Sequence, residues 1–149
     1  MSSPTDDGPH PSRLLVVGIP VAWVACGAGL LSTSVTRWFR RGPGSRSAGL
    51  ELADSIRSGV LSPSWGVWVA AGVYVLVGLG GGFIATAVVT HPALLVARGV
   101  TAAVCLIGFL LLGRVVPPSN WSSGPTIATF VFAFAVALST VQLVNTVRN

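Results

Sequence analysis

Side chains able to do acid–base chemistry are few in this sequence, and two of them lie only three residues apart. Glu51 and Asp54 fall in the stretch AGLELADSIRSGVLSP, and a helix would place both carboxylates on one face. Such a pair can bind a cation or relay a proton. The alternative is a solvated polar face on which Asp54 pairs with Arg57. Glu51 and Asp54 are therefore candidate functional residues, with the ion pair as the simpler interpretation.

Arg98 is a second candidate, because only fifteen residues separate it from Arg114. Crossing a membrane takes roughly 20 apolar residues, so a span that ends near Arg114 must include Arg98. An arginine at the membrane centre costs about 2.5 to 3.5 kcal/mol, and less where its long side chain reaches the surface. We expect Arg98 to snorkel toward the headgroups. The alternative is an intramembrane cation that pairs with a carbonyl or, beside His91, holds an anionic ligand.

Metal, redox and cofactor chemistry lack a supporting motif. His10 and His91 are too few and too far apart in the sequence for a metal site. Cys26 and Cys105 both fall in apolar runs, with no CxxC pattern, and act most simply as small buried packing residues. No phosphate-binding loop is present. We therefore expect no metal, no cofactor and no enzymatic activity.

The chain as a whole is far more apolar than a soluble domain. Charged residues make up 9% of it and hydrophobic residues 52%, with a mean hydropathy of +0.77, whereas soluble domains carry about 25% charged residues. All nine basic residues are arginine. The net charge of +5 would suggest nucleic acid if these arginines coated a soluble face. They lie beside apolar runs instead, so we expect a lipid bilayer and no nucleic acid as the surroundings of this protein.

Charge-free intervals predict where the chain crosses the bilayer. Uncharged stretches of 23, 40 and 33 residues follow Arg13, Arg57 and Arg114. Each is long enough for at least one helix across a core of about 30 Å, and the runs are continuously apolar rather than alternating, which argues against strands. We expect an all-α, four-transmembrane-helix bundle, one integral membrane domain over 1–149, with spans at 14–36, 66–89, 93–113 and 126–146.

The first loop is expected to hold a short amphipathic interfacial helix over 48–61. Its apolar positions, Leu52, Ala53, Ile56 and Val60, share one face, which would lie toward lipid or toward the bundle. The pattern LELADSIRSG followed by SWGVWVAAGVYVLVGLGGG, within 48–84, resembles uncharacterised small four-span integral membrane proteins of actinobacterial type. The resemblance implies a four-helix membrane fold and no assigned activity, so it points to no functional residue.

Arginine placement predicts the orientation. Four spans put six arginines on one face, which the positive-inside bias makes cytoplasmic, with both termini outside. These six are Arg37, Arg40, Arg41, Arg46, Arg57 and Arg114, against Arg13, Arg98 and Arg148 on the other face. Four tryptophans fall at span ends of the six-arginine face, as in an aromatic belt: Trp38, Trp65, Trp68 and Trp121. We expect an anchor among anionic headgroups made by Arg37, Trp38, Arg40, Arg41 and Arg46.

Small residues at helical spacing predict close helix packing, within the chain or against a partner. They are Gly18, Ala22 and Cys26 in the first span, Gly78 and Gly82 in the second, and Ala133 and Ala137 in the fourth. We expect a structural or accessory subunit that packs against a membrane protein partner or forms a homo-oligomer. One alternative is a small oligomeric transporter or channel whose path is lined by Arg98, His91 and the glycine-rich second span. Another is a membrane enzyme that acts on a lipid or quinone through Glu51 and Asp54.

Overall fold

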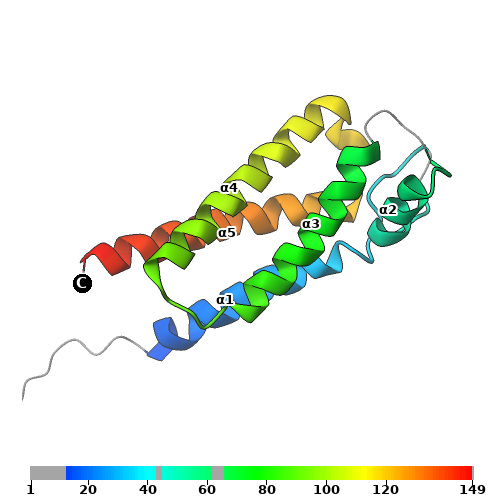
Figure 1. The fold of residues 1–149 in the computed structure, drawn as a ribbon. Coiled ribbons are helices and arrows are strands. Elements are labelled where there is room, and N and C mark those ends of the chain that lie inside the picture. Colours follow the sequence, from blue (N-terminus) through cyan, green and yellow to red (C-terminus); the bar gives the residue numbers. More distant parts are fainter. Residues whose placement is uncertain (1–12, 43–44, 62–65, 149) are drawn as a thin grey trace, which may run out of the picture.

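The computed structural model describes residues 13–42, 45–61 and 66–148, and this part of the chain is helical (Figure 1). The elements are α1 (Arg13–Ser32), α2 (Gly49–Arg57), α3 (Gly66–Ala85), α4 (Pro92–Val115), a 3-10 turn (Pro118–Asn120) and α5 (Ser123–Arg148). Within the described residues, extended pairing is limited to two isolated bridges. The all-α prediction is confirmed.

Three helices, α3, α4 and α5, are long and apolar enough to cross a membrane. They have 20, 24 and 26 residues, which at about 1.5 Å per residue equals or exceeds a hydrocarbon core of about 30 Å. The first helix is apolar over the shorter stretch Val17–Ser32. The helix boundaries lie within four residues of the predicted spans.

The first helix ends at Ser32 rather than at the predicted residue 36, because polar side chains compete with its last turn. Ser32, Thr33 and Ser34 each donate a hydroxyl hydrogen bond to the carbonyl three residues earlier, at 2.7, 2.6 and 2.7 Å. Such bonds offer the backbone an alternative to the helical ladder. The chain turns over residues 33–35 instead of continuing the helix.

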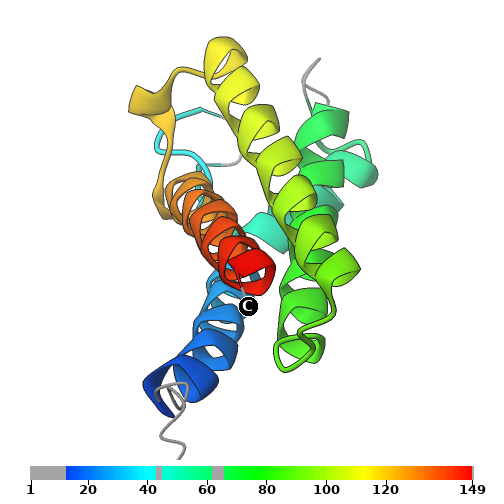
Figure 2. The same cartoon turned by 90° about the vertical axis from the view of Figure 1, so that its left-hand side faces the viewer.

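The helices form an incomplete bundle (Figures 1 and 2). Helix α1 packs against α3 and α5, α4 packs against α5, and α2 covers the start of α3. The consecutive helices α3 and α4, although joined by a short turn, make very little close backbone contact. Around the bundle the order is therefore α3, α1, α5, α4, with an opening between α4 and α3.

Closest approach between α1 and α3 occurs at two glycines. A Cβ built on Gly27 would lie 2.6 Å from the carbonyl oxygen of Gly80, and one built on Gly80 would lie 2.9 Å from the carbonyl oxygen of Gly27. Both distances are too short for a side chain, so the two backbones touch. Small residues at helix crossings allow this contact in membrane proteins.

Several of the predicted packing residues do not lie in contacts within the chain. At Gly18, Gly78 and Gly82, no atom lies within 4 Å of a Cβ built on the glycine. Two others, Ala133 and Ala137, are exposed, Ala22 is half-buried, and Cys26 is 3% exposed. The glycine-rich run GLGGG contains four glycines, and it is Gly80 that faces α1, which turns Gly78 and Gly82 outward.

Two loops pair at the end of the bundle opposite the start of α1 and the end of α5 (Figure 1). Phe39 and Trp121 form an isolated antiparallel bridge. Main-chain hydrogen bonds extend it, from Arg40 N–H to Asn120 O (2.8 Å), from Ser122 N–H to Trp38 O (3.0 Å) and from Gly124 N–H to Arg37 O (2.9 Å). The arginine-rich loop and the loop between α4 and α5 therefore lie at the same end, as the span count predicts.

The short loop helix α2 turns its apolar residues toward the bundle. Leu52 and Ala53 are 1% and 0% exposed, and Ile56 packs against the core. The helix ends at Arg57, four residues before the predicted boundary, and the chain then passes through Gly59 with a φ of +77°. Val60 consequently lies outside the helix and is exposed.

Candidate functional site

Arg98 is buried inside the bundle. Its residue is 4% exposed, its Nε donates to the Thr86 hydroxyl at 3.2 Å, and its Nη2 donates to the Thr86 carbonyl oxygen. Thr86 directly follows the last residue of α3, where carbonyls lack helical partners and the helix dipole is negative. The snorkelling prediction is therefore wrong: the end of α3 offers the guanidinium acceptors inside the protein. The alternative in which Arg98 pairs with a carbonyl is confirmed.

An aromatic ring covers the same guanidinium. The central carbon of the Arg98 guanidinium lies 4.8 Å from the ring centroid of Trp23, and Phe83 meets that ring edge-on at 5.0 Å. Trp23 Nε1 donates to the side-chain oxygen of Gln142 at 2.8 Å, and both residues are buried. The Arg98 cluster, comprising Trp23, Thr86, Arg98 and Gln142, thus joins α1, the end of α3, α4 and α5.

Two buried polar atoms near this level have no hydrogen-bond partner among the described residues, Nη1 of Arg98 and the hydroxyl oxygen of Ser139. Gly99 approaches Ser139 so closely that a Cβ on it would lie 3.1 Å from the serine Cβ. The positive charge is met by neutral acceptors and a π face, since no acidic residue falls in these helices. This arrangement fixes the register of four helices, and it contains no acid–base pair or nucleophile–base pair.

The other sequence candidates lie apart from this cluster. His91 is exposed before the start of α4, and its side chain makes no capping bond. Glu51 accepts a hydrogen bond from the Ala48 N–H at 3.1 Å, and Asp54 pairs with Arg57 at 3.0 Å on the exposed face of α2. The predicted ion pair is confirmed. Within the described residues, no three His, Cys, Asp or Glu side chains gather as a metal site would require.

The predicted headgroup anchor divides into two groups. Its arginines, Arg37, Arg40, Arg41 and Arg46, are exposed. Trp38 is 1% exposed, and its Nε1 donates to the Thr33 carbonyl oxygen at 3.0 Å, so its assignment to the anchor is wrong. Gly49 and Gly124 make room for the ring, because a Cβ on either would lie 2.6 or 2.8 Å from ring atoms.

The remaining tryptophans of the predicted belt also differ from one another. Trp121 is 9% exposed and donates through Nε1 to the Val116 carbonyl oxygen at 3.0 Å. Trp68 is 78% exposed on α3, as expected of a belt residue, and Trp65 lies outside the described residues. Two of the four tryptophans are therefore part of the core.

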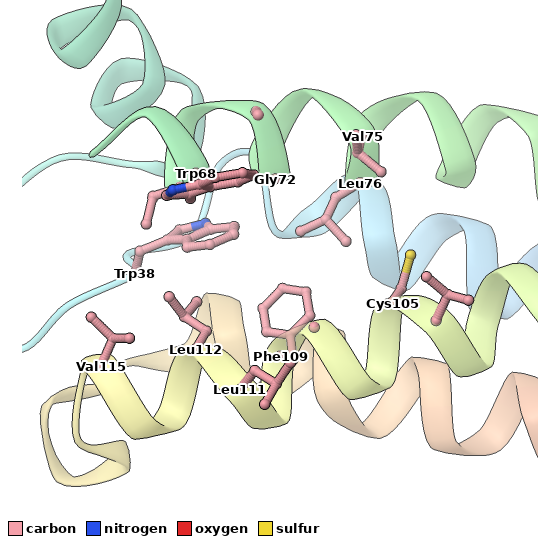
Figure 3. A pocket seen from close by; sticks show the side chains of 14 residues that line it. Trp38, Trp68, Gly72, Val75, Leu76, Cys105, Phe109, Leu111, Leu112 and Val115 are labelled. Atoms are coloured by element: carbon pink, nitrogen blue, oxygen red, sulfur yellow. The ribbon is translucent and has the colours of Figure 1, made fainter. Parts of the chain in front are cut away.

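An apolar groove of about 680 Å³ lies in the opening between α3 and α4 (Figure 3). Trp38 and Phe109 project into it, with ring centroids 6.2 Å apart, and Phe109 also contacts Trp121 and Phe132. Residues from both helices complete the lining: Trp68, Val69, Ala71, Gly72, Val75 and Leu76 of α3, and Val104, Cys105, Gly108, Leu111, Leu112 and Val115 of α4. The groove does not include any residue of the Arg98 cluster.

No family model, curated protein or solved structure matches the chain. The two cysteines are free thiols, Cys26 in the core and Cys105 on the groove wall. Sequence reasoning missed Gln142 and Trp23 as partners of the buried arginine. A signal was present, since a glutamine and a tryptophan inside apolar runs each carry a polar group that needs a partner in lipid.

Proposed function

We propose that this protein is a non-enzymatic, four-span integral membrane protein that acts as an accessory subunit packed against a membrane partner. The fourth span would be α1. Its 20 residues reach about 30 Å as a helix, which matches the hydrocarbon core. Its buried contacts with α3 and α5 make it a part of the same bundle. A bundle of four spans also leaves both chain ends on one side of the membrane.

The observation that carries this proposal is the bare glycine ridge on α3, formed by Gly78 and Gly82. The two residues lie four apart on one face, and no atom lies within 4 Å of a Cβ built on either. In lipid, helices associate through close backbone approach at such small residues rather than through hydrophobic burial. The α1 contact already uses Gly80, so the ridge is available to a helix of another protein.

The interior supports an accessory subunit over a transporter. A transport path needs a polar cavity, whereas the groove between α3 and α4 is apolar and does not reach Arg98. The guanidinium is covered by Thr86 and Trp23. His91, which would have shared a path with Arg98, is exposed directly before α4, and its side chain makes no capping bond.

We expect the end of the bundle that holds the two paired loops to face the cytoplasm. Six arginines and two carboxylates occur in 37–65 and 114–125, which favours the cytoplasmic side. There α2 would lie at the interface, and the exposed Arg37, Arg40, Arg41 and Arg46 would lie among anionic headgroups. Single cysteines at Ser45 and Ser119, in a background without Cys26 and Cys105, should resist an impermeant thiol reagent added to intact cells. Labelling of both from outside would reverse the orientation.

Purification from native membranes in mild detergent tests the partner. We expect the full chain to retain a second protein in a fixed stoichiometry, identified by mass spectrometry. Gly78→Leu and Gly82→Leu should lose that protein, because the added side chain separates the two backbones. Gly18→Leu, the same change at an equally open glycine of α1, should retain it.

Two outcomes would contradict the proposal. One is retention of the second protein by both ridge variants, which would place the contact elsewhere. The other is a homo-oligomer or monomer that holds no second protein and transports a solute in liposomes. That result would favour the transporter.

A further inference from the structure

We propose that the groove between α3 and α4 binds one acyl chain of an anionic phospholipid taken from the arginine-rich leaflet. The inference rests on the proposed membrane location and not on the proposed partner. It concerns the α3–α4 groove, defined by the lining residues given above, and not the bare glycine ridge. The argument combines the length of the groove, its lining and the charge at its end.

The groove has the length of one leaflet. It runs from Trp68 to Leu76 on α3 and from Val104 to Val115 on α4. At about 1.5 Å per residue these stretches are about 12 and 16 Å long, close to half of a hydrocarbon core of about 30 Å. One acyl chain covers about this half of the core, so the groove fits a single hydrocarbon chain.

The lining is suited to a hydrocarbon chain. Val75 and Val104 are 51% and 63% exposed on opposite walls, and Phe109 lies between the two helices. Two glycines, Gly72 and Gly108, have no atom within 4 Å of an added Cβ, which leaves open space along each wall. A volume of about 680 Å³ is within the range of about 300 to 1,000 Å³ typical of small-molecule sites.

Arginines near the loop end of the groove favour a lipid with an anionic headgroup. Trp38, Trp68 and Val115 mark the end nearest the loops (Figure 3). Arg37 and Arg114 directly precede Trp38 and Val115 in the sequence, and both are exposed. Exposed tryptophans such as Trp68 and exposed arginines are both typical of the headgroup level, where cations attract anionic lipids. A phosphate-bearing headgroup with net negative charge therefore fits this end.

The test is lipid titration of the full chain in mild detergent, followed by native mass spectrometry. The two probes are dioleoyl phosphatidylglycerol, which is anionic, and dioleoyl phosphatidylcholine, which has the same chains and no net charge. We expect one tightly bound phosphatidylglycerol and a preference of about fivefold for each arginine engaged. Arg37→Gln and Arg114→Gln should each lower that preference without abolishing binding of phosphatidylcholine.

Groove-filling variants provide the second arm. Gly108→Leu should weaken binding of both lipids at least tenfold, and Gly72→Leu, from the opposite wall, should do the same if Gly108→Leu does not fold. Gly81→Leu is the matched control, because Gly81 is an equally open glycine of α3 outside the groove. Phosphatidylglycerol with a photoactivatable acyl chain should crosslink within residues 68–76 and 104–115.

Four outcomes would overturn the inference. Equal affinity for both lipids would show that the charge of the headgroup does not contribute to binding. Wild-type binding in both Gly72→Leu and Gly108→Leu, or crosslinks spread evenly over all exposed helix faces, would show that the groove holds no specific chain. A lipid-free dimer in the native mass spectra that Gly72→Leu and Gly108→Leu dissociate would assign the groove to self-association. Each result leaves the partner test on Gly78 and Gly82 unaffected.

Discussion

Replacement of Arg98 by lysine should destabilise the protein more than replacement by methionine. Arg98 donates to two atoms of Thr86 and lies over the Trp23 ring, which a planar guanidinium can do at once. A compact ammonium cannot keep both bonds and the ring contact. A lysine would still carry the burial penalty of a charge. The change to lysine, although it keeps the charge, is therefore expected to cost more than the change to methionine.

The magnitudes follow from the contacts. A hydrogen bond between membrane helices contributes about 0.6 to 1.7 kcal/mol, and a cation–π contact about 0.5 to 2 kcal/mol. Arg98→Lys loses one such bond and most of the ring contact, for a cost of about 2 kcal/mol. Arg98→Met loses all of these interactions, but it recovers up to about 2.5 kcal/mol of charge burial. Its net cost is therefore about 1 kcal/mol.

The free energy of unfolding can be measured by titrating the protein from dodecyl maltoside into sodium dodecyl sulfate, with tryptophan fluorescence as the signal. Arg114→Lys is the control, because Arg114 is an exposed arginine of the same helix. It should change stability by no more than a few tenths of a kcal/mol. If Arg98→Lys behaved like this control, the arginine would reach the headgroups and the buried cluster would be refuted.

Two further predictions concern contacts between helices. Gly80→Ala should destabilise the protein by about 1 to 3 kcal/mol in the same titration, since its Cβ would lie 2.9 Å from the carbonyl oxygen of Gly27. Gly81→Ala should be neutral or slightly stabilising, because that position is open and alanine favours helix. Equal effects of the two changes would contradict the observed helix crossing. Trp23→Phe and Gln142→Leu should each cost about 1 to 2 kcal/mol, and the double variant should cost clearly less than their sum, because both remove the same hydrogen bond. Strict additivity would show that the bond contributes nothing.

Transmembrane helices were predictable because bilayer length and charge exclusion act along the chain. The intervals after Arg57 and Arg114 place α3, α4 and α5 to within a few residues. The side-chain hydroxyls that end α1 at Ser32 could also be read from the sequence STS. The rotation of each helix about its own axis could not be predicted from the sequence. It depends on which neighbour a helix meets, and that neighbour is set by packing elsewhere in the bundle.

Two errors and one omission share this cause. The sequence shows how far Arg98 lies from the end of its span, but Thr86 comes within its reach only through the turn that joins α3 and α4. Trp38 has the residue type of a belt tryptophan, yet Gly49 and Gly124 provide space for its ring from positions remote in sequence. Similarly, only the approach of α1 determines that Gly80, among its neighbouring glycines, becomes buried.

The contacts of Trp38 have a consequence for the order in which the protein folds during its synthesis. Its ring lies against Gly124, and its carbonyl oxygen accepts a hydrogen bond from the Ser122 N–H, so both contacts can form only after residues 122–124 have left the ribosome. Until then the Trp38 ring has only its nearer contacts, with the Thr33 carbonyl oxygen and with Gly49. The arginine-bearing loop therefore gains its remaining contacts only after residues 122–124 have been synthesised.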